Sequence, residues 1–63
     1  MATFGTILRH LREHQGHNQN AFGELLGDSL GQPALAQGTV SRYESGNLVP
    51  RLEWRLRFYE QFR

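Results

Sequence analysis

The residues best suited to bind another molecule lie in the second half of the chain, at positions 37–46. If this stretch is a helix, Val40 and Tyr43 share one face, because residues three apart lie on the same side of a helix. The other face then carries small and polar residues: Gln37, Gly38, Thr39, Ser41 and Arg42. Amides, hydroxyls and a planar guanidinium are groups that hydrogen-bond base edges and phosphates. The pattern predicts one face that packs and one that touches a nucleic acid, with Gly46 as the cap that ends the helix.

Three histidines suggest a second chemistry, metal binding. His10, His14 and His17 are spaced i, i+4 and i+7, which would align three imidazoles on one continuous helix. Gly16 is expected to end that helix before His17, and no carboxylate obviously completes a zinc ligand set. The chain also has no cysteine. We therefore expect no metal and no other cofactor.

Catalysis is not expected either. The serines and histidines show no nucleophile spacing, the carboxylates are scattered, and no glycine-rich phosphate loop follows a strand. The sequence thus predicts neither an enzyme nor a small-molecule ligand.

Length and composition set further bounds. The chain has 63 residues, enough for one domain (1–63) with a small core, near the lower size limit for folding without disulfides or metals. Its net charge is only +1, which says little about a nucleic-acid partner. All seven cationic residues are arginine. This favours bidentate contacts, or it reflects a GC-rich genome, which is the interpretation we prefer.

Membrane association is not predicted. No apolar run approaches the ~20 residues of a membrane span, and the N-terminus lacks the basic start and apolar run of a signal peptide. We expect a soluble, cytoplasmic protein.

Two helices are predicted before the central stretch. The first, residues 3–14, has Thr3 as a candidate N-cap. Its apolar stripe at i, i+3, i+4 and i+7 consists of Phe4, Ile7, Leu8 and Leu11. The second, residues 19–27, follows the N-cap Asn18. Its Gly23 costs roughly 1 kcal/mol relative to alanine inside a helix, so we expect another helix to approach closely there.

Residues 28–36 allow two interpretations. The second helix can continue to Leu30 and end at Gly31, or it can end at Gly27 and leave a loop with Leu30 and Leu35 turned inward. We favour the loop, and we expect the third helix over residues 36–45.

The last predicted helix, residues 51–61, follows Pro50, which suits a helix start. It is rich in aromatic residues: Trp54, Phe58, Tyr59 and Phe62. Aromatic side chains often dominate interface energetics, so these four form either a homodimer or partner surface or the cap of a small core. Both interpretations remain open, and a core is the more common outcome.

Taken together, these features resemble the Cro/phage-repressor class of helix-turn-helix domains, also called the xenobiotic-response-element family. The match rests on residues 7–12, on residues 16–19 leading into 22–27, on residues 40–46, and on Pro50. The resemblance implies an all-α, lambda-repressor-like fold of four to five helices, in which the third helix recognises DNA.

The resemblance also implies roles for single residues. Gln19 is expected to contact a phosphate and brace the recognition helix, and Gln37 to read a base. Base or phosphate contacts are implied for Gly38, Thr39, Ser41 and Arg42, and phosphate contacts for Ser45 and Asn47. Arg12 and Glu44 resemble the buried ion pair that joins the first helix to the end of the third, which is a structural role.

One segment departs from the family pattern. From Gly27 to Ser41 the chain spans 14 residues, about seven more than the family usually has, so we expect an elongated turn between helices 2 and 3.

We expect sequence-specific binding of double-stranded DNA by a small bacterial or phage transcriptional regulator, a repressor, which could act as a homodimer. The alternative is a protein-interaction module, an antitoxin or adaptor, that uses the aromatic last helix.

Overall fold

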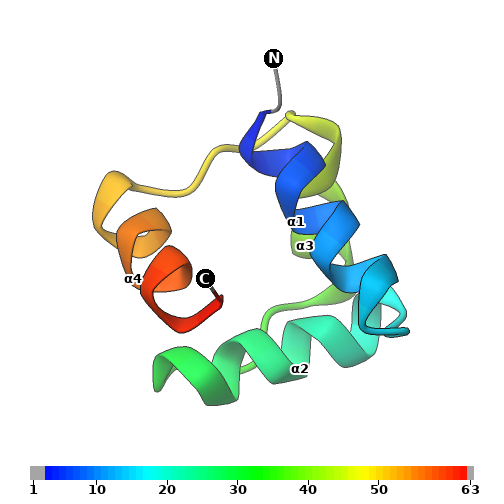
Figure 1. Cartoon of the computed structure of the whole chain (residues 1–63), viewed down its shortest axis with the longest axis horizontal. Helices are drawn as coiled ribbons and strands as arrows, with labels where there is room; N and C mark the ends of the chain where they lie inside the picture. Colours follow the sequence, from blue (N-terminus) through cyan, green and yellow to red (C-terminus); the bar gives the residue numbers. More distant parts are fainter. Residues whose placement is uncertain (1–2, 63) are drawn as a thin grey trace.

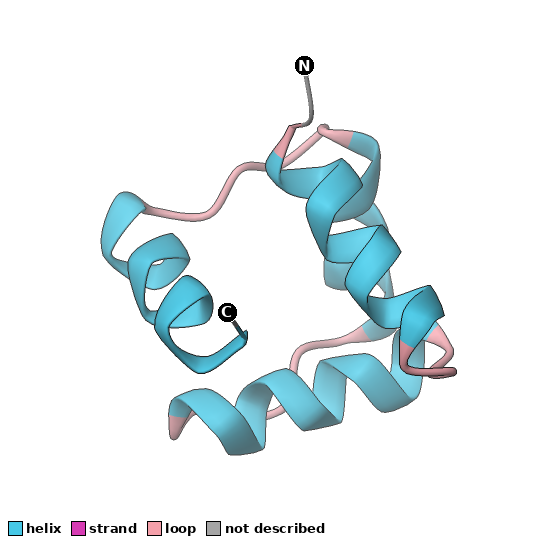
Figure 2. Ribbon diagram, in the orientation of Figure 1, coloured by secondary structure: helices cyan, strands magenta, loops and turns pink. Residues whose placement is uncertain are grey.

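Four helices make up the fold of residues 3–62. The computed structural model describes residues 3–62, with α1 at Phe4–His14, α2 at Gln19–Leu30, α3 at Gln37–Ser45 and α4 at Leu52–Phe62. Within residues 3–62 there is no strand (Figure 2), so the predicted all-α class is confirmed. Figure 1 shows α1 and α3 side by side, α2 running past one end of both, and α4 on the opposite side of the molecule. None of the helices in this described part is long and apolar enough to cross a membrane.

The first two helices start at the caps that the sequence indicates. The Thr3 hydroxyl accepts a hydrogen bond from the Thr6 backbone N–H at 3.2 Å, and the Asn18 side-chain oxygen accepts one from the Ala21 N–H at 2.7 Å. Each bond satisfies one of the free N–H groups of a first turn. Gly16 then takes a positive φ of 76° after α1 has ended, which separates the two helices.

The end of α2 corrects the prediction. The helix does not stop at Gly27 but continues to Leu30, where Gly31 provides a left-handed cap with φ 67°. Burial of Leu30, which is only 3% exposed, favours the extra turn. The glycine at position 27 has a packing role instead, because a Cβ there would lie 2.7 Å from the Ala34 Cα and 2.8 Å from the Pro33 carbonyl oxygen.

The chain returns along α2 before α3 begins. The Leu35 N–H donates to the Gly23 carbonyl at 3.1 Å, and a Cβ on Gly23 would collide with the Leu35 carbonyl oxygen. The close approach expected at Gly23 is therefore made mainly by this returning backbone, although the α3 residue Val40 also lies 3.4 Å from the same Cβ position. The extra residues of the elongated turn form the last turn of α2 and a non-helical segment that returns along it. The helix α3 therefore still starts beside the middle of α2.

The core lies where the four helices meet. Its fully buried side chains are Leu8, Phe22, Leu26, Val40 and Phe58. Phe4 joins α1 to α4 through edge-on ring contacts with Trp54, Phe58 and Tyr59, at centroid distances of 6.0, 5.4 and 6.1 Å. Ile7, which belongs to the predicted apolar stripe of α1, is 38% exposed and lies outside this core.

The aromatic residues of α4 mostly pack against the core, which is one of the two roles that the sequence leaves open for them. Phe58 is 1% exposed, and Trp54 and Phe62 are half-buried against the core cluster. Positions 54, 58 and 62 are spaced i, i+4 and i+8, which puts them on one face of the helix. Tyr59 alone of the set is exposed, at 40%. The face of α4 that points outward instead carries Leu52 and Leu56.

Candidate nucleic-acid interface

The helix α3 has one anchored face and one open face, as its residue pattern predicts. Val40 is fully buried, Tyr43 is half-buried, and both pack into the core. The approach of α1 depends on Gly5, where a Cβ would lie 2.8 Å from the Glu44 carbonyl oxygen and would also strike the Tyr43 carbonyl oxygen. This packing role of Gly5 was not predicted from the sequence, although the residue follows Phe4 in the first turn of α1.

The open face carries the polar residues. Gln37, Gly38 and Arg42 are exposed, and Thr39 and Ser41 are half-buried. A Cβ added at Gly38 would meet no atom within 4 Å, so this end of α3 is bounded by open space. Side chains and backbone are therefore accessible along the first turns of α3.

A hydrogen-bonded network connects three helices below this face. The Arg12 Nε donates to Glu44 Oε2 at 2.6 Å and the Arg12 Nη2 to Glu44 Oε1 at 3.1 Å, which is the bidentate pair expected between α1 and α3. The two side chains are only 14% and 7% exposed. The hydrogen bond to Glu44 raises the pKa of Arg12 above its ordinary value. Arg12 also donates to the His17 carbonyl at 3.1 Å, so one guanidinium ties the link between α1 and α2 to the end of α3.

Gln19 extends this network to the start of α3. Its Nε2 donates to Glu44 Oε1 at 3.3 Å, and its Oε1 accepts from Gln37 Nε2 at 2.6 Å. Both bonds fix the Gln37 side chain relative to the ion pair. A glutamine amide has two N–H donors and a carbonyl acceptor, so Gln37 keeps one donor and its oxygen free. Those are the two groups that a bidentate contact with adenine uses.

A polar groove opens beside the network. Its volume is about 260 Å³, and it is lined by Arg9, Arg12, Gln19, Ser41, Glu44 and Ser45. Arg9 was missed at the level of sequence, although it precedes Arg12 by three residues and so lies on the same side of α1. Its side chain is 63% exposed and forms a 3.5 Å ion pair with Glu13, which is weak and solvated. The groove is thus lined by an exposed arginine, Arg9, whose guanidinium can reorient toward a bound anion.

The turn after α3 combines two predicted residues with a structural role. The Ser45 hydroxyl donates to the Arg42 carbonyl at 3.1 Å, and the Asn47 N–H approaches the same hydroxyl at 3.5 Å. Gly46 caps the helix with φ 83°. Ser45 lines the polar groove with Gln19 and Ser41, whereas Gly38, Thr39, Arg42 and Asn47 lie outside it. The predicted contact residues therefore divide between the groove and the open face of α3.

The histidines do not come together. No group of three potential metal ligands occurs among residues 3–62. The His17 ring instead lies stacked on Phe22, with a centroid distance of 6.2 Å.

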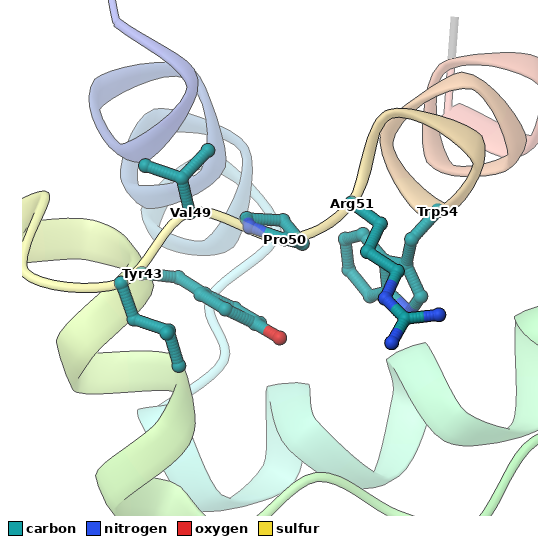
Figure 3. A pocket seen from close by; sticks show the side chains of 6 residues that line it. Tyr43, Val49, Pro50, Arg51 and Trp54 are labelled. Carbon is teal, nitrogen blue, oxygen red and sulfur yellow. The ribbon is translucent and has the colours of Figure 1, made fainter.

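A second, apolar hollow lies on the other side of α3. It has a volume of about 330 Å³ and is lined by Tyr43, Leu48, Val49, Pro50, Arg51 and Trp54 (Figure 3). Burial raises the pKa of Tyr43 above its ordinary value. Leu48 and Val49 are 43% and 62% exposed.

Comparison with known proteins agrees with this geometry. Residues 3–61 match the family model of the helix-turn-helix domain, as the resemblance to the Cro/phage-repressor class predicted. No curated protein and no solved structure matches the chain significantly.

Proposed function

Because this chain belongs to the helix-turn-helix domain family, we propose that it binds double-stranded DNA sequence-specifically as a small transcriptional repressor, with α3 in the major groove. The observation that carries this proposal is the open polar face of α3 together with the Gln37 amide, which Gln19 holds in place at 2.6 Å. A side chain held in advance loses less conformational freedom when it binds.

The bases are read by the start and middle of α3. Gln37 pairs with adenine through its free donor and acceptor, and the exposed guanidinium of Arg42 serves guanine or a nearby phosphate. Thr39 and Ser41 add single hydroxyl contacts. Gly38 contributes by lacking a side chain, since the space above it lets backbone approach the groove wall.

The phosphates are bound at the groove between α1, α2 and α3. Gln19 stands at the start of α2, where backbone N–H groups and the helix dipole favour an anion. Ser45 and Asn47 contact the backbone from the turn after α3. Arg9 supplies a mobile positive charge from the other wall of the groove. With a net charge of only +1, such local cations provide the electrostatic attraction.

A repressor that acts as a homodimer requires two half-sites about 34–36 Å apart, one turn of the duplex. The bound sequence then has two-fold symmetry, because each copy presents the same α3 to its own half-site.

Selection of bound sequences from a random duplex library tests the proposal. We expect enrichment of one motif, and a homodimer would enrich it as a palindrome with half-sites about 10 base pairs apart. Arg9→Gln should reduce the slope of log affinity against log salt by about one, without changing the motif. A folded protein that enriches no sequence at low salt would contradict sequence-specific binding.

One observation favours a second function, binding to another protein. The exposed apolar side chains of α4, Leu52 at 59% and Leu56 at 54%, lie on the face turned away from the core. An antitoxin or adaptor would use this face in place of the aromatic residues that pack against the core. If this second function holds, replacing Leu56 with glutamine should abolish partner capture and leave DNA binding unchanged. Gln37→Ala should weaken DNA binding and leave partner capture unchanged.

A further inference from the structure

The residues that lengthen the connection between α2 and α3, residues 28–34, form a detour of the chain. It begins after Gly27 with the last turn of α2, and its end returns to Gly27, since the Ala34 Cα lies 2.7 Å from where a Gly27 Cβ would be. Within it, the Gln32 N–H donates to the Gly27 carbonyl at 2.8 Å. The detour therefore starts and ends beside Gly27, and the turn at Gly31 lies at its far end.

The helix α4 holds this detour on both sides of Gly31. The Arg57 Nη2 donates to the Leu30 carbonyl at 2.6 Å, which satisfies a carbonyl at the end of α2 that has no partner within the helix. The Trp54 Nε1 donates to the Gln32 side-chain oxygen at 3.1 Å. Both bonds are partly buried, and both come from residues three apart on α4. One face of α4 thus holds the detour both before Gly31, at Leu30, and after it, at Gln32.

The returning limb leads directly into α3. Leu35 is bonded to Gly23, and the next carbonyl, that of Ala36, accepts from the Thr39 and Val40 N–H groups at 3.0 and 3.1 Å. No side chain caps this helix start. The placement of the first turn of α3, where Gln37 lies, therefore depends on how residues 31–35 are held.

We propose that Trp54 and Arg57 are positioning residues for DNA recognition, because they fix the detour and through it the first turn of α3. The proposal rests on the proposed function, since it says that these residues set the orientation of α3 relative to the DNA. Contacts with base edges are short and directional, whereas attraction to phosphates acts over several ångströms. Loosening the detour must therefore weaken binding to the correct sequence more than binding to arbitrary DNA.

Amide hydrogen exchange in the DNA-free protein tests the coupling first. Gln32→Ala removes the acceptor of the Trp54 bond at a position that is outside the core cluster, and Trp54→Phe removes the donor while keeping an aromatic ring. We expect the amides of Leu35, Thr39 and Val40 to exchange about tenfold faster in either variant. The Phe22 amide, bonded to Asn18 at the other end of α2, serves as the internal control and should be unchanged. Unchanged exchange at all four amides, or an equal increase at all four, would overturn the proposal.

Binding to a selected duplex and to an unrelated duplex provides the second readout. We expect the ratio of the two affinities to fall about fivefold or more in Gln32→Ala and in Trp54→Phe, and the double variant to lose no more than the single ones. Both substitutions conserve charge, so phosphate attraction is not altered directly. Arg57→Lys should retain the ratio, because an ammonium can also donate to the Leu30 carbonyl, whereas Arg57→Met should lose it.

The two proposals fail in different ways. An unchanged affinity ratio in Gln32→Ala, Trp54→Phe and Arg57→Met would overturn the positioning role even if the wild-type protein binds DNA. A wild-type protein that binds no duplex would overturn the proposed function and with it the role in recognition, while the exchange pattern would still decide whether α4 is coupled to the start of α3.

Discussion

Removal of the Glu44 carboxylate is the most informative test of what holds the recognition helix. Glu44→Ala takes away three hydrogen bonds at once, two from Arg12 at 2.6 and 3.1 Å and one from Gln19 at 3.3 Å. The Arg12 guanidinium, 14% exposed, is then left with only the His17 carbonyl. Breaking a shielded pair by deleting one partner leaves an uncompensated charge, so we expect a loss of about 3 kcal/mol of unfolding free energy.

The size of that loss is large for so short a chain. A domain of 63 residues is expected to be stable by roughly 3–9 kcal/mol. At about 4–8 °C per kcal/mol, the melting temperature of Glu44→Ala should fall by roughly 12–24 °C. Thermal unfolding followed by circular dichroism at 222 nm measures this shift, and urea unfolding gives the free energy independently.

The chain contains a matched control for this substitution. Glu13 also pairs with an arginine of α1, Arg9, but at 3.5 Å and with side chains that are 63% and 51% exposed. Glu13→Ala should therefore change stability by less than about 0.5 kcal/mol. If Glu44→Ala and Glu13→Ala had equal effects, the network could not be the support of α3 that its geometry indicates.

Three further outcomes are expected. Burial raises the folded-state pKa of Tyr43 above the ordinary value of a tyrosine, about 10. The phenol therefore contributes stability that is present below about pH 10 and is lost as pH rises through the folded pKa, and Tyr43→Phe should flatten the alkaline side of a stability–pH curve. Gly27→Ala should destabilise the fold by about 2 kcal/mol in urea unfolding, because its Cβ meets the backbone of residues 33 and 34. Gly38→Ala, which meets nothing, should stabilise it by about 0.5–1 kcal/mol.

Local signals in the sequence predicted the elements that position the site. Thr3 and Asn18 marked helix starts because a side-chain oxygen there can accept a backbone N–H, and both do. The spacing of Val40 and Tyr43 predicted which face of α3 packs. The pairing of Arg12 with Glu44 came from the family resemblance, since residues 32 positions apart give no local signal.

The remaining features depend on contacts between distant segments. Gly27 looked like a helix stop, but its role follows from residues 33 and 34 returning against it, and no local pattern encodes that return. The orientation of α4 was equally hidden, because both of its faces are apolar: one carries Trp54, Phe58 and Phe62, and the other carries Leu52, Leu56 and Tyr59. Phe58 rather than Leu56 is buried because the rings of Phe4 and Trp54 meet it there.

The central claim is that α3 reads DNA bases through a Gln37 amide held by Gln19. The most direct measurement is the affinity of wild type and Gln37→Ala for the selected duplex and for the same duplex changed at one base pair of the motif at a time. We predict that Gln37→Ala loses about 1–3 kcal/mol of binding to the selected duplex and no longer discriminates at one position, which is an A·T pair in each half-site. A folded Gln37→Ala variant that keeps the wild-type preference at every position would contradict the claim.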